Sequence, residues 1–396
     1  MIVRSLYSIV LGALIVGCGR LDFASTSANS NDATADSNHN SDADMGLNSV
    51  TVTASDSHTC ATRFGQLACW GANNDGQLGV GDQVQRLMPS SVSGTDWVEV
   101  GLGGTFTCAR KMNGAVFCWG SNTALQLGAL TPASSSVPLQ VALPVAARTI
   151  RCGETHACAI LENGQLWCWG DNVEGQLGLD DSGTDVTTAQ PTQVPTNQSW
   201  TSVAGGQGNT LALAGTTMFG TGRNTSGELG GSATVGQYRA LTALSNVAFT
   251  VVTPGSNHTQ AIDSQARMFA WGSNGAGQLG TGDRVAVPAP QLIDATRSWR
   301  TVSTDVFHTC AVDNLGALFC WGRSIEGQLG NGSNSPDRLV VTPSGTDKTW
   351  TSVSVGRFHS CAVATDQTIW CSGENNEGQL GLGDTQRRAA WTNVVF

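Results

Sequence analysis

Short runs in which apolar and polar residues alternate recur along most of the chain, separated by Gly, Asn and Asp. Residues 299–302, 307–312 and 315–322 show the pattern clearly. Alternation with a period of two is typical of half-buried β-strands, and the residues between the runs favour tight turns. A turn-rich segment follows Trp321-Gly322, and a Pro-containing loop then leads to another short strand. Each unit of this kind therefore predicts four short strands.

Five units contain a Trp-Gly segment that leads to Gly-Gln-Leu-Gly or a close variant of it, and two worn copies without the Trp bring the total to seven. The copies follow one another at spacings of 49, 50, 52, 50, 50 and 51 residues. A fixed period of about 50 residues with four short strands is typical of a propeller blade. We therefore predict an all-β fold, a seven-bladed β-propeller of four-stranded repeats over residues 48–396. The copies begin at Trp70, Trp119, Trp169, Thr221, Trp271, Trp321 and Ser372.

A column of β-branched residues supports a strand face that all the blades share. Its members are Val52, Val100, Ile150, Val203, Val252, Val302 and Val353. The chain starts within the first unit, and its last strand is equivalent to the strand around Val92. We therefore expect residues 392–396 to complete the blade begun by residues 50–53. Such a C-terminal strand joining the first blade would close the ring and remove its free edges.

Ten of the twelve cysteines fall in pairs that bracket a short turn. Positions equidistant from a hairpin turn face each other within disulfide reach. Units four and five have lost both members of the pair together, as bonded residues would. We predict five cross-strand disulfides, with reduced core thiols as the alternative; Cys152 is left over as a buried free thiol. The predicted pairs are Cys60–Cys69, Cys108–Cys118, Cys158–Cys168, Cys310–Cys320 and Cys361–Cys371.

The N-terminus resembles an export signal. Arg4 precedes an apolar stretch at 6–16, and Ile15-Val16-Gly17-Cys18 is similar to a bacterial lipobox. We expect residues 1–18 to be a lipoprotein signal peptide and Cys18 to carry a lipid that anchors the chain to a membrane. The alternative is an ordinary cleaved signal peptide. Either way the chain is exported to the cell envelope, where disulfides are permitted. The polar, acidic residues 19–47 are expected to form a disordered tether.

Composition limits the partners. Gly accounts for 49 of 396 residues and charged residues for 13%, which fits short strands and turns rather than long helices. The net charge is −10, and only two lysines occur, Lys111 and Lys348. Because phosphate-driven binding needs clustered Lys and Arg, we expect no nucleic-acid partner. We also expect a monomer.

Five of the six histidines share one column of the repeat, and a ring of imidazoles invites a metal hypothesis. Equivalent positions of a propeller lie far apart around the ring, so we expect a repeated hydrogen bond from side chain to backbone and no metal. Phe106 and Asn209 replace His in units two and four. The histidines are His58, His156, His258, His308 and His359.

Other groups of residues that could suggest a ligand site have structural explanations. The recurring tryptophans could form a ligand platform, but their period favours packing between blades. The acidic loop 180–185 could hold calcium, yet it lacks the full ligand spacing, so we expect a solvated loop. The sequence contains no Gly-x-Ser-x-Gly elbow, Walker lysine or spaced catalytic pair. We therefore expect no catalytic residue, no cofactor and no enzymatic activity.

The repeated Trp-Gly-x-Asn-x-x-Gly-Gln-Leu-Gly, preceded by His-x-Cys-Ala and Trp-x-x-Val, resembles the repeats of the regulator of chromosome condensation family. The resemblance covers residues 49–396 and implies a seven-bladed β-propeller. The Cys-rich version is similar to an exported bacterial lipoprotein branch of that family. Leu125 replaces the middle Gly of the second unit, and the fourth unit has lost its Trp and both Cys, so these blades are expected to be irregular.

The founding members of that family catalyse guanine-nucleotide exchange on a small GTPase and bind chromatin. The residues that match here belong to the scaffold, so the resemblance does not carry those activities over. We expect a non-enzymatic, surface-anchored module that binds a protein or glycan through inter-blade loops, with residues 129–137 and 180–190 as contact regions. The alternatives are an exchange-factor-like regulator and an inhibitor of an extracellular hydrolase, as a secreted bacterial propeller of similar design inhibits β-lactamases.

Overall fold

The computed structural model describes residues 49–180, 187–231, 235–334 and 336–396. The predicted signal peptide, Cys18, the tether at 19–47 and most of the acidic loop 180–185 lie outside the described residues. Within them the chain forms 28 β-strands and no helix. Accordingly, none of these residues belongs to a helix that could cross a membrane.

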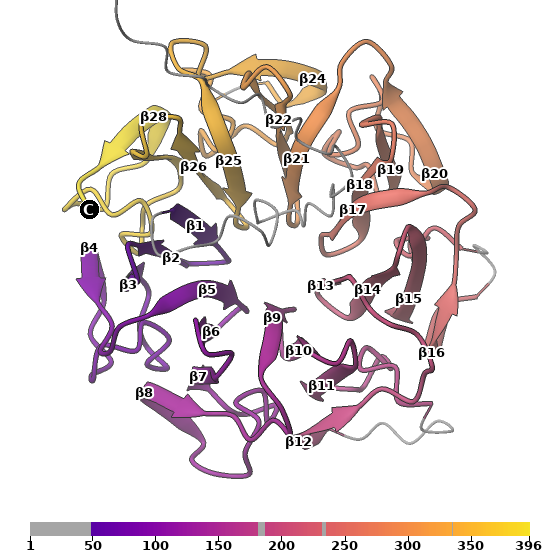
Figure 1. The fold of residues 1–396 in the computed structure, drawn as a ribbon. Helices are drawn as coiled ribbons and strands as arrows, with labels where there is room; N and C mark the ends of the chain where they lie inside the picture. Colours follow the sequence, from indigo (N-terminus) through magenta and orange to yellow (C-terminus); the bar gives the residue numbers. More distant parts are fainter. Residues whose placement is uncertain (1–48, 181–186, 232–234, 335) are drawn as a thin grey trace, which may run out of the picture. The chain divides into compact units, whose positions relative to one another are not determined.

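The strands form seven antiparallel sheets, each built from four consecutive strands. The sheets stand around a common axis as the blades of a propeller, with the first strand of each blade innermost and the fourth outermost (Figure 1). Blade 1 comprises β1 (Val50–Ala54), β2 (His58–Arg63), β3 (Gln66–Gly71) and β4 (Arg86–Ser91). Blade 2 comprises β5 (Trp97–Leu102), β6 (Phe106–Lys111), β7 (Val116–Ser121) and β8 (Ser134–Gln140). Blade 3 comprises β9 (Ala147–Cys152), β10 (His156–Leu161), β11 (Leu166–Gly170) and β12 (Thr188–Gln193).

The remaining blades repeat this order. Blade 4 comprises β13 (Ser202–Gly205), β14 (Asn209–Ala214), β15 (Thr217–Arg223) and β16 (Gln237–Ala243). Blade 5 comprises β17 (Phe249–Pro254), β18 (His258–Asp263), β19 (Met268–Gly272) and β20 (Val287–Asp294). Blade 6 comprises β21 (Trp299–Thr304), β22 (His308–Asp313), β23 (Leu318–Gly322) and β24 (Arg338–Ser344). Blade 7 comprises β25 (Trp350–Val355), β26 (His359–Ala364), β27 (Ile369–Gly373) and β28 (Arg388–Val394). The predicted fold class is confirmed.

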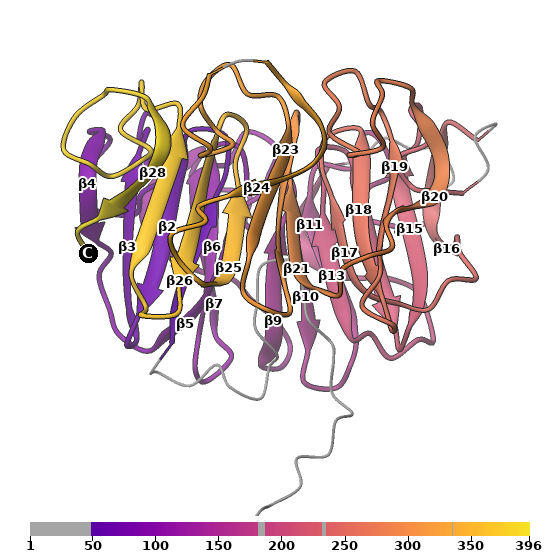
Figure 2. The same cartoon turned by 90° about the horizontal axis from the view of Figure 1, so that it is seen from above.

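Antiparallel order gives the propeller two distinct faces, seen edge-on in Figure 2. Turns between the first and second strands and loops between the third and fourth strands lie on one face, which we call the loop face. Hairpin turns between the second and third strands lie on the other, which we call the hairpin face. The Gly of the Trp-Gly position lies at or near the end of each third strand, where the chain enters the loop face. Gly71 takes a φ of +104° there, and a Cβ on it would lie 2.5 Å from the carbonyl oxygen of Ser57, so only Gly fits.

The apolar core lies between neighbouring blades rather than within one. One cluster joins Val52 and Trp70 of blade 1 to Val363 and Val394 of blade 7. All five tryptophans of the Trp-Gly column are fully buried. Each indole Nε1 donates to a backbone carbonyl of the preceding blade, for example Trp321 to Gln278 at 2.9 Å. The prediction that the tryptophans pack blade against blade is confirmed.

The ring closes between blades 7 and 1, but the predicted strand exchange is wrong. β28 pairs with β27 of its own blade, placing Val394 opposite Ile369. Blade 1 already has its outer strand, because β4 pairs with β3 and the Val92 amide donates to the Leu67 carbonyl at 2.9 Å. The C-terminal strand is thus equivalent to β4 and completes blade 7.

Packing and hydrogen bonds close the ring instead. The ring of Phe396 lies 6.3 Å from that of Trp70, and Arg63 Nη1 donates to the Phe396 carbonyl at 2.7 Å. Deeper in the seam, Thr59 donates to the Gln379 carbonyl at 2.8 Å. The seam between the first and last blades therefore uses the same kinds of contact as the seams between consecutive blades.

Each of the five predicted cysteine pairs forms a disulfide between the second and third strands of its blade. All five place their Cα atoms 4.1 Å apart in directly opposed register positions. Cys152 forms no disulfide. Its side chain is half-buried rather than buried, because it lines the central channel. Several disulfides in one chain are compatible with an exported protein.

Candidate functional site

The turns between the first and second strands converge on the axis of the propeller at the loop face. The innermost strands approach one another there, and the turns that follow them line a central cavity of about 110 Å³. Gly103, Gly153, Gly206 and Gly255 are among the residues that line it, and they contribute no side chain. Any side chain longer than Gly at these turns therefore determines the chemistry of the channel mouth.

Three carboxyl groups from different blades occupy those turns. Asp56 belongs to blade 1, Glu154 to blade 3 and Asp305 to blade 6, and all three line the cavity. Arg357 of blade 7 lies beside them, its Nη1 3.7 Å from Asp56 Oδ2. The channel mouth is therefore acidic, with one guanidinium as counter-charge at its rim.

Burial and mutual repulsion disfavour the charged forms of these acids. Burial, together with the charge of Asp56, raises the pKa of Glu154 to about 7, although Arg357 works in the opposite direction. Desolvation raises the pKa of Asp305 well above its ordinary value, with Asp56 and Glu154 adding repulsion. Burial also raises the pKa of Asp56, against the attraction of Arg357. The mouth therefore gains protons near neutral pH.

Cys152 lines the same cavity. Burial raises the pKa of its thiol to about 12. The thiolate, which is the nucleophilic form, is therefore scarce at neutral pH. Glu99 of blade 2 forms buried ion pairs with Arg110 of the same blade, at 2.6 Å, and with Arg151 of blade 3, the residue before Cys152. Thr149 also donates to Glu99, so the carboxylate joins the two blades.

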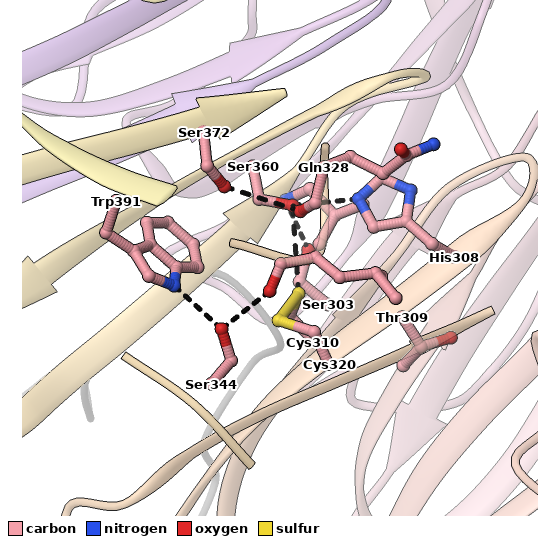
Figure 3. The surroundings of a disulfide bond; sticks show 12 residues. Ser303, His308, Thr309, Cys310, Cys320, Gln328, Ser344, Ser360, Ser372 and Trp391 are labelled. Atoms are coloured by element: carbon pink, nitrogen blue, oxygen red, sulfur yellow. Dashed lines mark hydrogen bonds between the residues drawn. A yellow bond between two sulfur atoms is a disulfide. The ribbon is translucent and has the colours of Figure 1, made fainter. Parts of the chain in front are cut away.

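The column histidines lie at the seams between blades, and each one bonds a hydroxyl of the next blade. His308 Nε2 lies 2.8 Å from Ser360 Oγ, and Ser360 Oγ donates at 2.9 Å to the carbonyl of Gln328, back in the blade of His308. Figure 3 shows this relay beside the Cys310–Cys320 disulfide, whose Cys310 Sγ lies 3.7 Å from the same hydroxyl. We call the arrangement of imidazole, hydroxyl and carbonyl the seam relay.

The imidazole repeats this contact at four further seams. The partners are Thr107 for His58, Thr210 for His156, Thr304 for His258 and Thr59 for His359, at 2.5–3.0 Å. Three of these hydroxyls donate directly to a carbonyl of the preceding blade. Thr304 differs, because it contacts the Thr309 hydroxyl at 2.9 Å, and Thr309 in turn donates to the Gln278 carbonyl of the preceding blade. The hydrogen bond that we predicted from imidazole to backbone is therefore wrong in its partner, since a hydroxyl stands between ring and carbonyl. Burial lowers the pKa of His156 to about 4 and of the other four to about 3, so all five imidazoles are neutral.

The described residues contain no group of three or more His, Cys, Asp or Glu side chains arranged to hold a metal ion. The predicted contact loop 129–137 lies on the loop face, where Leu130 is 71% exposed. The loop 180–190 is described only in part. Other aliphatic side chains are also exposed on loops of this face: Val84, Val173, Val285 and Ile325.

Sequence reasoning missed the acidic channel mouth. Its members stand two or three residues before the column histidine of their own units, where most units have Gly or another uncharged residue. An overlay of the seven turns, combined with the expectation that they meet at the axis, would have brought Asp56, Glu154 and Asp305 together.

Fold and repeat together define the class of this protein: a disulfide-braced, seven-bladed β-propeller built from a repeat with Trp-Gly and Gly-Gln-Leu-Gly. A family described as the RCC1-like domain matches residues 14–294, and the regulator of chromosome condensation (RCC1) repeat matches residues 316–363 and 350–379. The chain belongs to the RCC1-like domain family.

Curated relatives match over short segments. The chain is 36% identical over 96 residues to the human probable E3 ubiquitin-protein ligase HERC3, a match that covers 23% of this chain and 9% of that protein. It is 40% identical over 62 residues to rat alsin, covering 15% of this chain and 4% of alsin. The chain thus spans less than a tenth of the length of these relatives.

Solved structures share the fold at low identity. Human WBSCR16 superposes with a TM-score of 0.77 at 19% identity, covering 84% of this chain and 94% of that chain. Prp20p from Saccharomyces cerevisiae, described together with its binding to Gsp1p and histones, gives a TM-score of 0.75 at 21% identity, with 90% of each chain covered. These likenesses establish a common architecture.

Proposed function

We propose that the propeller is a non-enzymatic protein-interaction module, exported from the cytoplasm and held at a membrane surface by a lipid on Cys18. The observation that carries the proposal is the use of the column histidines, which are side chains of a type common in catalytic and metal sites. All five are fully buried, neutral and bonded across seams. These histidines hold neighbouring blades together and are not accessible to a partner. The exposed loops are the variable and accessible part of each unit.

The loop face is the best contact surface. Leu130, Val84 and Val173 project from three consecutive blades and are 71%, 62% and 51% exposed. Exposed aliphatic side chains grouped on one face of a rigid scaffold favour a protein partner over a small molecule. A glycan, the other partner class considered from the sequence, would instead call for exposed aromatic rings on these loops.

Export is supported by the disulfides and by the sequence before the propeller. Five cross-strand bonds form and persist in an oxidising compartment. The lipobox-like Ile15-Val16-Gly17-Cys18 and the polar residues 19–47 fit an anchor and a tether. Incorporation of radiolabelled palmitate into the full chain, and its loss in Cys18→Ala, tests the anchor. A Cys18→Ala variant that still incorporates label would contradict it.

Capture experiments test the binding role. The propeller, residues 49–396, would be immobilised and incubated with envelope extract, and retained proteins identified. Leu130→Asp combined with Val84→Asp should abolish retention. Leu315→Asp is the matched control, because Leu315 is 87% exposed on a hairpin turn of the opposite face. Equal retention by all three proteins would refute the loop face as the contact surface.

A second candidate is an exchange-factor-like role, favoured by the shared fold with Prp20p, which binds Gsp1p. Release of fluorescent nucleotide from small GTPases in the presence of the propeller measures it directly. A stimulated release, together with a cytosolic location of the full chain, would replace the envelope proposal. Inhibition of secreted hydrolases, including β-lactamases, is the third outcome that the capture experiment would reveal.

A further inference from the structure

The seven seams of the ring are not equally braced. Five carry the seam relay from a histidine to a hydroxyl of the next blade. Phe106 replaces histidine in blade 2, but its seam with blade 3 gains the buried ion pair between Glu99 and Arg151. Phe106 itself is fully buried in the apolar cluster between the two blades. Six seams therefore have either a relay or a buried ion pair.

The seventh, between blades 4 and 5, has neither among the residues that the structure describes. Asn209 occupies the histidine position, is fully buried, and finds no hydrogen-bond partner for either end of its amide among the described residues. The hydroxyl that a histidine would bond belongs to Thr259, which donates only to the Glu228 carbonyl, at 2.7 Å. A buried amide without partners costs free energy in the closed state. This seam is therefore weakened at the repeat position where histidine secures five of the others.

The two blades beside this seam are also the two without a disulfide. Leu211 and Gly220 face each other in blade 4, and Gln260 faces Ala270 in blade 5, at the register positions of the cysteines. Between Cys168 and Cys310 the chain consequently has no covalent cross-link. Blade 4 has also replaced the column tryptophan with Thr221, whose hydroxyl donates to the Gly175 carbonyl at 2.8 Å.

Some contacts across the seam remain. Trp271 Nε1 donates to the Glu228 carbonyl at 2.8 Å, and Arg223 Nη2 donates to the Ser256 carbonyl at 2.6 Å. An apolar cluster that includes Leu229 and Phe249 fills the space between the blades. The seam is thus closed in the ground state, but its closure depends on packing and on a few hydrogen bonds at its loop-face end.

We infer that the ring has a built-in opening point: blades 4 and 5 separate locally at their seam while the other six seams stay closed. In a closed circular array each blade is held by two neighbours, so a first opening needs one seam to give way. The orphaned Asn209 amide selects which seam that is, and the missing disulfides leave the two blades beside it without an internal cross-link. Opening would expose the apolar cluster between β14 and β17.

Native-state hydrogen exchange of the full chain, read by mass spectrometry at pH 7, tests the inference. Amides of β14 and β18 should exchange at least about tenfold faster than those of β22 and β26, which hold equivalent positions in blades 6 and 7. Equal protection in all four strands would overturn the proposal without any variant.

A reciprocal pair of substitutions tests whether Asn209 causes the faster exchange at this seam. Asn209→His supplies the relay to Thr259 and should slow exchange in β14 and β18 about tenfold, leaving β22 unchanged. His308→Asn, the matched control, should speed exchange in β22 and β26 by a similar factor. A uniform change in every blade would show that only global unfolding is measured and would overturn the inference. Gln260→Cys with Ala270→Cys places a cross-link inside blade 5, which does not span the seam. Exchange in β14 should therefore stay fast in this variant, and protection of β14 by that bond would overturn the inference even if Asn209→His folds poorly.

Discussion

The imidazole Nε2 of His359 lies 2.8 Å from the hydroxyl of Thr59, 300 residues away along the chain. This contact has the same form as the relay between His308 and Ser360, which belong to consecutive blades. The first and last blades therefore bind each other through the same histidine-to-hydroxyl contact that four seams between consecutive blades use. A propeller of this kind needs no exchanged strand to close its ring.

The C-terminal residues should nevertheless contribute to closure. Removing Val395 and Phe396 deletes the ring contact with Trp70 and the hydrogen bond from Arg63. We expect the free energy of unfolding to fall by about 2–3 kcal/mol, from lost apolar burial and one charge-assisted bond. Thermal unfolding followed by circular dichroism measures the loss. Val395→Ala, at a side chain 75% exposed, should leave the melting temperature unchanged.

Acid should destabilise the propeller steeply. The five column histidines have folded pKa values of about 3 to 4 against an ordinary 6.5. Unfolding therefore takes up protons below pH 6.5: the stability from the neutral imidazoles is complete above pH 6.5 and is lost as the pH falls toward the folded values. Each contributes a slope of about 1.4 kcal/mol per pH unit, so five approach about 7 kcal/mol per pH unit.

The channel-mouth acids oppose this trend. Because the pKa of Glu154 is raised to about 7 in the folded state, the fold takes up that proton before the unfolded chain does and gains stability as the pH falls through 7. Denaturant midpoints between pH 7.5 and 4.5 should therefore change little at first and then fall. His258→Asn should reduce the later slope by about 1.4 kcal/mol per pH unit. An unaltered slope would show that this imidazole is protonated in the folded state.

Glu99 is expected to be the most sensitive carboxylate in the fold. It is 1% exposed and pairs with both Arg110 and Arg151, so Glu99→Gln removes a buried negative charge that two guanidinium groups share. The loss should be about 3–5 kcal/mol in urea unfolding. Arg86→Gln removes a solvent-exposed pair with Asp82 and should cost about 1 kcal/mol or less. Comparable losses from both variants would contradict the burial argument.

Cysteine substitutions should distinguish the disulfide-bonded cysteines from the free thiol of Cys152. Replacing Cys310 and Cys320 together with Ala should destabilise the fold by about 2–3 kcal/mol, since the bond closes a loop of about ten residues. Cys152→Ser should have a small effect. With a pKa of about 12, the Cys152 thiol should also resist iodoacetamide at pH 8 in the folded protein. Peptide mapping without reduction measures both pairing and alkylation, and rapid labelling of Cys152 would contradict the environment described.

The repeat made the blades and disulfides predictable because each depends on contacts within one unit. Cys310 and Cys320 face each other across a single hairpin, so their spacing suffices. The partner of His308 could not be found in this way, because Ser360 belongs to the next unit and passes the bond on to Gln328. The channel mouth was missed for a similar reason: Asp56, Glu154 and Asp305 meet only where separate blades converge on the axis.

The wrong prediction that the C-terminal strand joins the first blade has a different origin. The equivalence of Val394 and Val92 was recognised correctly, yet the pattern of a unit does not say where one sheet ends and the next begins. Pairing decides it: β4 satisfies the outer edge of β3, so β28 has only β27 to join. Backbone pairing of this kind leaves no mark in the alternation of apolar and polar residues.

The seam relay also bears on how such chains lengthen or shorten over time. At four of the seven seams the imidazole bonds a hydroxyl of the following unit, and that hydroxyl donates to a carbonyl of the unit before, so these four joints are interchangeable. Duplication or loss of one whole unit would preserve these joints. The free-energy cost would then come from closing the ring with a different number of blades.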